Sequence, residues 1–140
     1  MAITSTQRNA SAAPNFASGT FKDTGTVKKT ILNLGFVPRY FKLIDTAGTE
    51  LSFEVFAGMP ANDGWKTANA GDLTYETSGM PEFIENFDST TASTWTVYDA
   101  TAGSETDSSR LNLANEVFTG VSIPAALVPS SSAMYWFAIG

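Results

Sequence analysis

The chain has 140 residues, 43% of them hydrophobic and 12% aromatic, which fits a single globular domain with one core. Cysteine and histidine are absent, which excludes disulfides, thiol redox chemistry, cysteine-type zinc sites and Cys–His or Ser–His–Asp nucleophilic mechanisms. The net charge of −6 is unevenly distributed: residues 1–42 contain six basic side chains and one acidic one, whereas the remainder contains two basic and thirteen acidic ones.

This charge distribution favours protein over nucleic acid as a binding partner. An acidic body repels nucleic acid, whose binding depends on neutralising phosphates. A basic leading segment suits docking onto an acidic protein surface, including a copy of the same chain. No signal segment follows Met1, and no apolar run approaches the ~18 residues of a membrane span. We therefore expect a soluble, unprocessed protein without nucleic-acid or membrane partners.

Residues 1–19 are small and polar, with no periodicity of 2 or 3.6, and cannot bury enough apolar area to order in isolation. One interpretation is a frayed terminus. The other is an arm that orders on a partner, with Phe16 and Phe21 as its anchors. We adopt the second and predict an extended N-terminal arm over residues 1–20, followed by a β-sandwich domain over residues 21–140.

Residues 37–57 are predicted to form a long β-hairpin, because apolar and polar residues alternate with the period of a half-buried strand. A three-residue loop, Thr46-Ala47-Gly48, is expected to join the strands, with Gly48 at positive φ. That loop places Phe41 opposite Phe53 and Leu43 opposite Leu51. The other face then pairs Tyr40 with Glu54 and Lys42 with Ser52.

Further strands are predicted on both sides of this hairpin. One precedes it at residues 25–34, and shorter ones follow at residues 65–67, 72–77 and 94–99. Residues 81–87 fit either a helical turn or an edge strand, residues 110–123 hold one or two strands, and residues 133–139 form a last, apolar strand that needs burial on both faces or coverage by another subunit. The predicted class is all-β, an antiparallel β-sandwich or a jelly-roll-like barrel with an extended N-terminal arm.

Two acidic groups are candidates for chemistry, and each has a simpler explanation. One loop holds three carboxylates that can bind a hard cation but lack calcium-loop spacing: Asp99, Glu105 and Asp107. A solvated acidic loop is the favoured interpretation. Another group offers a carboxylate pair for glycoside hydrolysis: Glu82, Glu85 and Asp88. Since few reaction classes remain without His and Cys, we expect no enzyme, no catalytic residue, no metal site and no cofactor.

Three aromatic residues on predicted strands are candidates for stacking against sugar rings: Trp65, Tyr75 and Trp95. Aromatic residues on strands more often belong to a core or a subunit interface. The sugar hypothesis stays open because Trp65 follows Asp63-Gly64 at a loop edge, where ligands commonly bind.

Three segments together resemble small decoration proteins of tailed-bacteriophage heads. They are LGFVPRYFKLID, with Gly35, Phe36, Pro38, Arg39 and Tyr40; FEVFAGMP, with Phe56, Gly58 and Met59; and AMYWFAIG, with Tyr135 and Trp136. The resemblance covers roughly residues 25–80 and the last strand, whereas residues 82–109 depart from the pattern.

The resemblance implies a capsid decoration, or cement, protein: a non-enzymatic virion protein, made in the host cytoplasm, that binds the outside of the capsid lattice and links neighbouring capsomers. Its partners would be the major capsid protein and itself, as a homotrimer. The residues predicted to contact the capsid or a neighbouring subunit are Arg8, Phe16, Phe21 and Arg39. The alternative is a sugar-binding head-fibre or tail module that attaches to the host surface through Trp65 and Trp95.

Overall fold

The computed structural model describes residues 15–22, 29–46, 51–68, 71–88, 96–97, 117–128 and 133–140, almost entirely as β-strands. The elements are β2 (Phe16–Lys22), β3 (Lys29–Asn33), β4 (Tyr40–Asp45), β5 (Ser52–Phe56), β6 (Gly64–Thr67), β7 (Leu73–Glu76), β8 (Glu82–Asp88), β9 (Thr96–Val97), β10 (Val117–Pro124), the 3₁₀ turn η2 (Ala125–Leu127) and β11 (Ala133–Ile139). Over these ranges, no helix is long and apolar enough to cross a membrane.

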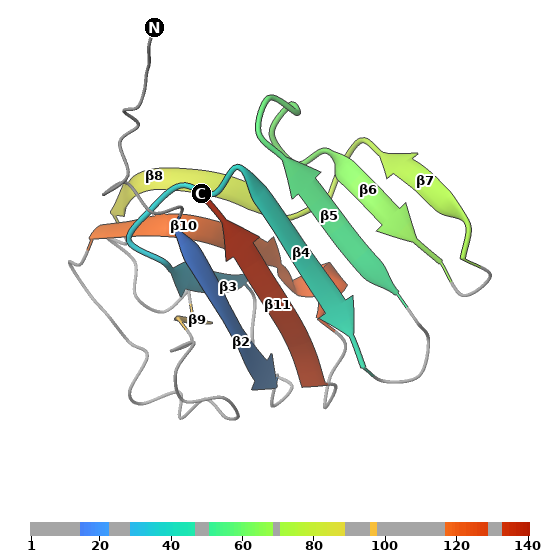
Figure 1. Cartoon of the computed structure of the whole chain (residues 1–140), viewed down its shortest axis with the longest axis horizontal. Coiled ribbons are helices and arrows are strands. Elements are labelled where there is room, and N and C mark those ends of the chain that lie inside the picture. Colours follow the sequence, from blue (N-terminus) through green and yellow to red (C-terminus); the bar gives the residue numbers. More distant parts are fainter. Residues whose placement is uncertain are drawn as a thin grey trace, which may run out of the picture.

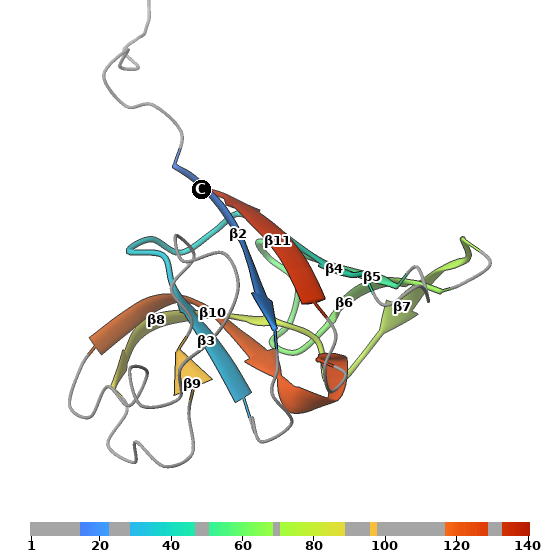
Figure 2. The ribbon, with the colours of Figure 1, turned by 90° about the horizontal axis from the view of Figure 1, so that it is seen from below.

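The strands form two sheets packed face to face. The larger sheet has the order β2-β11-β4-β5-β6-β7 and is antiparallel throughout, and the smaller has the order β8-β10-β3-β9. In Figure 1 the six-stranded sheet lies in front, and Figure 2 shows the two layers from the side, with β6 and β7 extending beyond the smaller sheet. The prediction of an all-β sandwich is confirmed.

The core lies between the sheets and is built by the period-two alternation of the central strands. On β4, Phe41 and Leu43 are fully buried while Tyr40, Lys42 and Ile44 are only partly covered. The other strands and two connecting segments add the remaining buried side chains: Phe21, Leu32, Phe53, Val55, Met80, Val121, Ile123, Val128, Met134, Trp136 and Ala138. Each large apolar side chain removed from water in this way contributes about 1.5–3 kcal/mol.

The register of the β4–β5 hairpin differs from the predicted one by two residues. Phe41 pairs with Val55 and Leu43 with Phe53, and the Asp45 N–H donates to the Leu51 carbonyl. The connection between the strands is therefore longer than the three predicted residues. The predicted faces are nevertheless correct, because a shift of two positions keeps every side chain on its own side of the sheet, whereas a shift of one would not.

The predicted arm of residues 1–20 overlaps a strand of the body, which corrects its boundary. All seven residues of β2 pair with β11, from Phe16 opposite Ile139 to Lys22 opposite Ala133. Phe21 is 1% exposed and belongs to the core, so it is not a contact residue. The segment was misjudged because β2 contains Gly19 and small polar residues, and its partner strand, not its own pattern, makes it a strand. Residues 1–14 lie outside the described part of the chain.

Several other sequence predictions can be compared with the strands. The predicted strands at residues 65–67, 72–77 and 133–139 correspond to β6, β7 and β11. The ambiguous segment at residues 81–87 is the strand β8, which is irregular where Asn86 takes a φ of 52°.

The remaining predicted strands are described over part of their length. Within residues 25–34, β3 occupies Lys29–Asn33, and within residues 94–99, β9 occupies Thr96–Val97. The predicted region at residues 110–123 holds β10, which begins at Val117 and pairs with both β3 and β8.

Two phenylalanines on β2 provide a matched test of this arrangement. Phe21→Ala should lower the free energy of unfolding by about 3–5 kcal/mol, because it leaves a cavity in the core. Phe16→Ala, on the same strand but with a side chain 65% exposed, should change it by less than about 0.5 kcal/mol. Denaturant unfolding followed by circular dichroism measures both, and equal effects of the two substitutions would contradict the placement of β2.

Candidate functional site

The six-stranded sheet has a second surface that faces away from the core, here called the outer face. Cross-strand pairing fixes its members, because residues paired across neighbouring strands share a side of the sheet. They are Phe16, Ser18 and Thr20 of β2; Tyr135, Phe137 and Ile139 of β11; Tyr40, Lys42 and Ile44 of β4; Ser52, Glu54 and Phe56 of β5; Trp65 and Thr67 of β6; and Leu73 and Tyr75 of β7. No other described strand lies on this side of the sheet in Figure 2.

The outer face concentrates the exposed apolar side chains of the described residues. Seven large hydrophobic side chains are exposed, and all but Val37 lie on this face: Phe16, Phe56, Leu73, Tyr75, Tyr135 and Ile139. Single exposed hydrophobic residues are ordinary on a protein surface, but a contiguous group on one sheet marks a binding surface. Val37 lies apart, in the connection between β3 and β4.

A polar cluster occupies the centre of the outer face. Tyr40 donates a hydrogen bond to the Glu54 carboxylate, and the Lys42 ammonium lies 3.8 Å from the same carboxylate oxygen. Burial raises the pKa of the Tyr40 phenol well above its ordinary value, and the hydrogen bond to Glu54 and its negative charge act in the same direction. The tyrosine therefore stays a neutral donor throughout the physiological range.

Aromatic rings surround this cluster. The Tyr40 ring lies 5.0 Å from that of Phe56 and 5.6 Å from that of Phe137, both in tilted geometry. Such contacts are worth about 0.5–1.5 kcal/mol beyond the buried area and restrict the rings to few rotamers. The outer face is thus a pre-ordered surface of rings around one ion pair.

The β6–β7 hairpin carries a second aromatic pair. The Trp65 and Tyr75 rings lie 5.2 Å apart at an interplanar angle of 65°, and the Tyr75 hydroxyl donates to the Asp63 carboxylate over 2.8 Å. This hydrogen bond is the main cause of the raised pKa of Tyr75. The two aromatic residues of the sugar hypothesis that are described therefore come together, while Trp95 lies outside the described residues.

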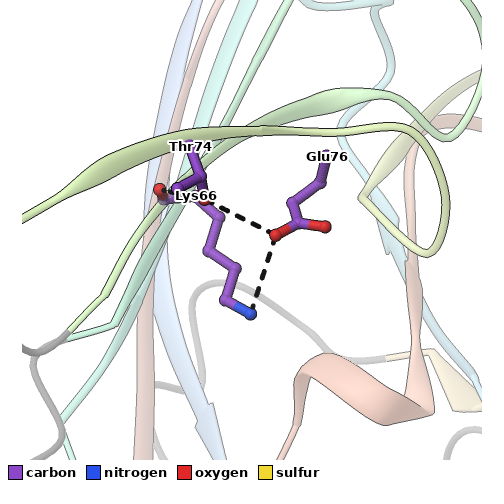
Figure 3. A network of polar contacts seen from close by, with 3 residues as sticks. All are labelled: Lys66, Thr74 and Glu76. Atoms are coloured by element: carbon purple, nitrogen blue, oxygen red, sulfur yellow. Dashed lines mark hydrogen bonds and ion pairs between the residues drawn. The ribbon is translucent and has the colours of Figure 1, made fainter.

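The opposite side of the same hairpin is polar. The Lys66 ammonium lies 3.9 Å from the Glu76 carboxylate, and the Thr74 hydroxyl lies 3.5 Å from that carboxylate and 3.3 Å from the Lys66 carbonyl oxygen (Figure 3). The hairpin is therefore amphipathic, with its aromatic side on the outer face. This difference in polarity identifies the outer face as the side that suits contact with another molecule.

The predicted contact residues have different positions. Phe16 lies on the outer face, whereas Arg8 lies outside the described residues. Arg39 is exposed and directly precedes β4. Its N–H donates to the Ile139 carbonyl over 2.7 Å, and its carbonyl accepts from the Ala57 N–H over 2.8 Å. The backbone of Arg39 is thus fixed at the edge of the outer face. Phe21, as described above, is in the core.

The acidic candidates form no metal-binding group among the described residues. No group of three potential metal-ligating side chains occurs there. Glu82 is partly buried and Glu85 is exposed, and Asp88 is the last residue of β8. A pocket of about 150 Å³ between the β5–β6 connection and the start of β8 contains Glu82 as the one ionisable side chain in its lining. Asp99, Glu105 and Asp107 lie outside the described residues.

Comparisons with known protein families, curated proteins and solved structures found no match to this chain. Function is therefore inferred from the outer face and from the residues that carry the sequence resemblance. The sequence predicted which side chains of β4 and β5 share a face of the sheet. It did not predict the whole outer face, because that face requires β11 to lie beside β4, a long-range pairing. The signal was present in the last strand, which is apolar at every position between Ala133 and Ile139.

The Tyr40–Glu54 contact predicts a stability change at high pH. Since folding raises the pKa of Tyr40 above its unfolded value of about 10, the contact stabilises the fold below about pH 10, and this stabilisation is lost as the pH rises further. Tyr40→Phe should remove this component, and Glu54→Gln should bring the phenol to ionise at lower pH. Ultraviolet titration of the phenolates and unfolding at several pH values measure both effects. The matched control is Asp63→Asn, which should leave the Tyr40 titration unchanged.

Proposed function

We propose that the protein is a non-enzymatic structural protein of a bacteriophage virion, which binds the outside of the capsid lattice and links neighbouring capsomers. The observation that carries the proposal is the outer face, a sheet surface that holds nearly all the exposed large apolar side chains of the described residues. A water-exposed surface of this kind favours association with protein.

The composition of the outer face supports binding to protein. Tyr, Trp and Phe are enriched at the centres of protein interfaces, and charged residues are depleted there. On this face the rings of Tyr40, Phe56 and Phe137 surround a single, mutually paired Lys42 and Glu54. Because the two charges already neutralise each other, covering the face leaves no isolated charge without a partner.

The three segments that carry the resemblance to decoration proteins are neighbours in the fold. Residues 34–45 and 53–60 form the β4–β5 hairpin with its flanks, and residues 133–140 add β11 on the other side of β4. Their ends also meet, since a Cβ atom on Gly140 would lie 2.5 Å from the Phe36 ring. The resemblance therefore covers one contiguous unit of structure, which supports the proposal more than scattered matches would.

Cementing follows from several contacts per copy. Each protein contributes a modest contact area, but a copy that touches two capsomers raises the effective concentration of the second contact, so the assembly resists expansion by avidity. The basic residues near the N-terminus, including Arg8, add an electrostatic attraction to acidic capsid surfaces. In this proposal residues 1–14 form the second attachment, and the protein acts as a homo-oligomer.

Binding to purified capsids of the encoding phage tests this function. A variant lacking residues 1–14 keeps β2 whole and should fold, but it should bind capsids at least about tenfold more weakly, because it loses one of two linked contacts. Co-sedimentation with capsids measures the affinity, and quantitative mass spectrometry of virions should find a copy number close to that of the capsid protein. Undiminished binding of the truncated protein would remove the arm from the proposal, and absence of the chain from virions would refute it.

The second candidate function is sugar binding by a head-fibre or tail module, and the Trp65–Tyr75 pair favours it. Aromatic faces can stack on a pyranose ring, and a neighbouring carboxylate such as that of Asp63 can accept hydrogen bonds from the sugar hydroxyls. The rings meet at 65°, however, and so form a corner, which fits a terminal sugar better than a long flat chain.

A glycan array discriminates this candidate from the first. If the protein binds sugars at this corner, Trp65→Ala should abolish the signal, because the stacking surface is lost. The matched control is Tyr135→Ala, which removes an aromatic ring from the same outer face at β11, three strands from the β6 strand of Trp65, and should leave sugar binding intact. An array without hits, or equal losses in both variants, would contradict sugar binding at Trp65.

A further inference from the structure

We infer that the outer face binds a second copy of the same chain, packed face to face about a two-fold axis that runs along the strands between β4 and β5. The inference rests on the proposed role of the outer face as a protein-binding surface and names a second copy as its partner, so that in this dimer the N-terminal segments and not the covered face contact the capsid. It is carried by the placement of opposite charges on the face, by the symmetry of the strand order and by the size of the sheet.

The strand order places the proposed axis at the centre of the sheet. In β2-β11-β4-β5-β6-β7, three strands lie on each side of the line between β4 and β5. Rotation by 180° about that line sets β4 over β5 of the partner subunit, β11 over its β6 and β2 over its β7. Every strand is therefore covered, and the strand directions stay nearly aligned, as in the common packing of two twisted sheets.

The charges at the centre of the face are complementary under this rotation. Lys42 and Glu54 are directly paired across β4 and β5, so they lie on opposite sides of the axis at the same height along the strands. The rotation brings Lys42 over Glu54 of the partner subunit, and Glu54 over Lys42 of the partner subunit. Four alternating charges then form one closed group, and each ammonium, with three donors, can serve both carboxylates.

Four aromatic side chains of the outer face also meet aromatic partners, whereas the remaining tyrosines, Tyr75 and Tyr135, lie over polar side chains of the partner subunit. Phe137, Lys42, Glu54 and Trp65 share one row across the sheet, so the rotation places Phe137 over Trp65 of the partner subunit. Tyr40 and Phe56 share the next row and exchange in the same way. The centre of the proposed interface is therefore aromatic, and polar side chains such as Ser18 and Thr20 lie towards the β2 edge. An apolar centre with a polar rim is typical of stable protein interfaces.

The charge of the face favours its own image over a different partner. The two central charges are one positive and one negative. A strongly acidic or strongly basic partner would therefore attract one of them and repel the other, with no net electrostatic gain. The size is also sufficient. Six strands spaced ~4.8 Å apart, each rising ~3.3 Å per residue, give a flat area on the order of 500 Å², and side-chain relief brings it near the ~800 Å² that each partner of a standard interface buries.

Sedimentation equilibrium of the full chain tests the inference directly. The expected particle mass is twice the 14.9 kDa of one chain. Lys42→Glu and Glu54→Lys should each weaken the dimer by at least about tenfold, because each brings like charges together across the axis. A mixture of the two variants should associate more tightly than either alone, since one copy then carries two negative and the other two positive side chains at positions 42 and 54. A purely intramolecular role of the pair would give no such rescue.

Two controls complete the experiment. Val37→Ser, which removes an exposed apolar side chain away from the outer face, should leave the dimer unchanged. The double variant Lys42→Glu with Glu54→Lys should dimerise like the original chain. Circular dichroism verifies that each variant is folded. A monomer or a trimer at concentrations up to about 100 µM, or a mixture no tighter than its components, would overturn the inference. Capsid binding by a monomeric protein would do so while leaving the proposed function intact.

Discussion

The structure depends on one strand that is apolar on both of its faces. β11 buries Met134, Trp136 and Ala138 against the core and presents Tyr135, Phe137 and Ile139 on the other side. The four-stranded sheet covers the first face. Among the described residues, no strand covers the second. A strand of this kind is best placed inside a sheet, where its backbone groups are paired on both edges. Its second apolar face, when it is exposed, marks a surface for contact with another molecule.

The position of β11 explains why the N-terminal strand belongs to the body. Without β2, the edge of β11 would expose a row of unpaired backbone groups beside an apolar surface, which is the usual template for aggregation. β2 pairs with β11 along its whole length and places Phe21 in the core. The same sequence features that suggested an unstructured leader, small and polar residues, are those that suit an edge strand.

The sequence predicted the side to which each residue points better than it predicted the residue it faces. The alternation in β4 and β5 identified the core side chains Phe41, Leu43, Phe53 and Val55, all of which are buried. Their register was wrong by two because any even shift preserves this alternation, and the loop that decides it has no unique signal. The last strand was predicted with its observed bounds. The outer face could not be assembled, because it requires β11 to lie between β2 and β4, and pairings between distant segments leave no local pattern.

The polar cluster at the centre of the outer face explains how an apolar sheet surface can be selective. Rings alone would adhere to many apolar surfaces, since the hydrophobic effect has no direction. The Lys42–Glu54 pair changes this, because any partner that covers the face must either leave the pair undisturbed or meet it with matching charges. Covering the pair with an apolar surface would remove both charges from water without new hydrogen bonds, a cost of several kcal/mol. Tyr40 adds to this selectivity, because its hydrogen bond holds the Glu54 carboxylate in place. The aromatic residues therefore supply the affinity of the face, and the three polar side chains determine which partner can use it.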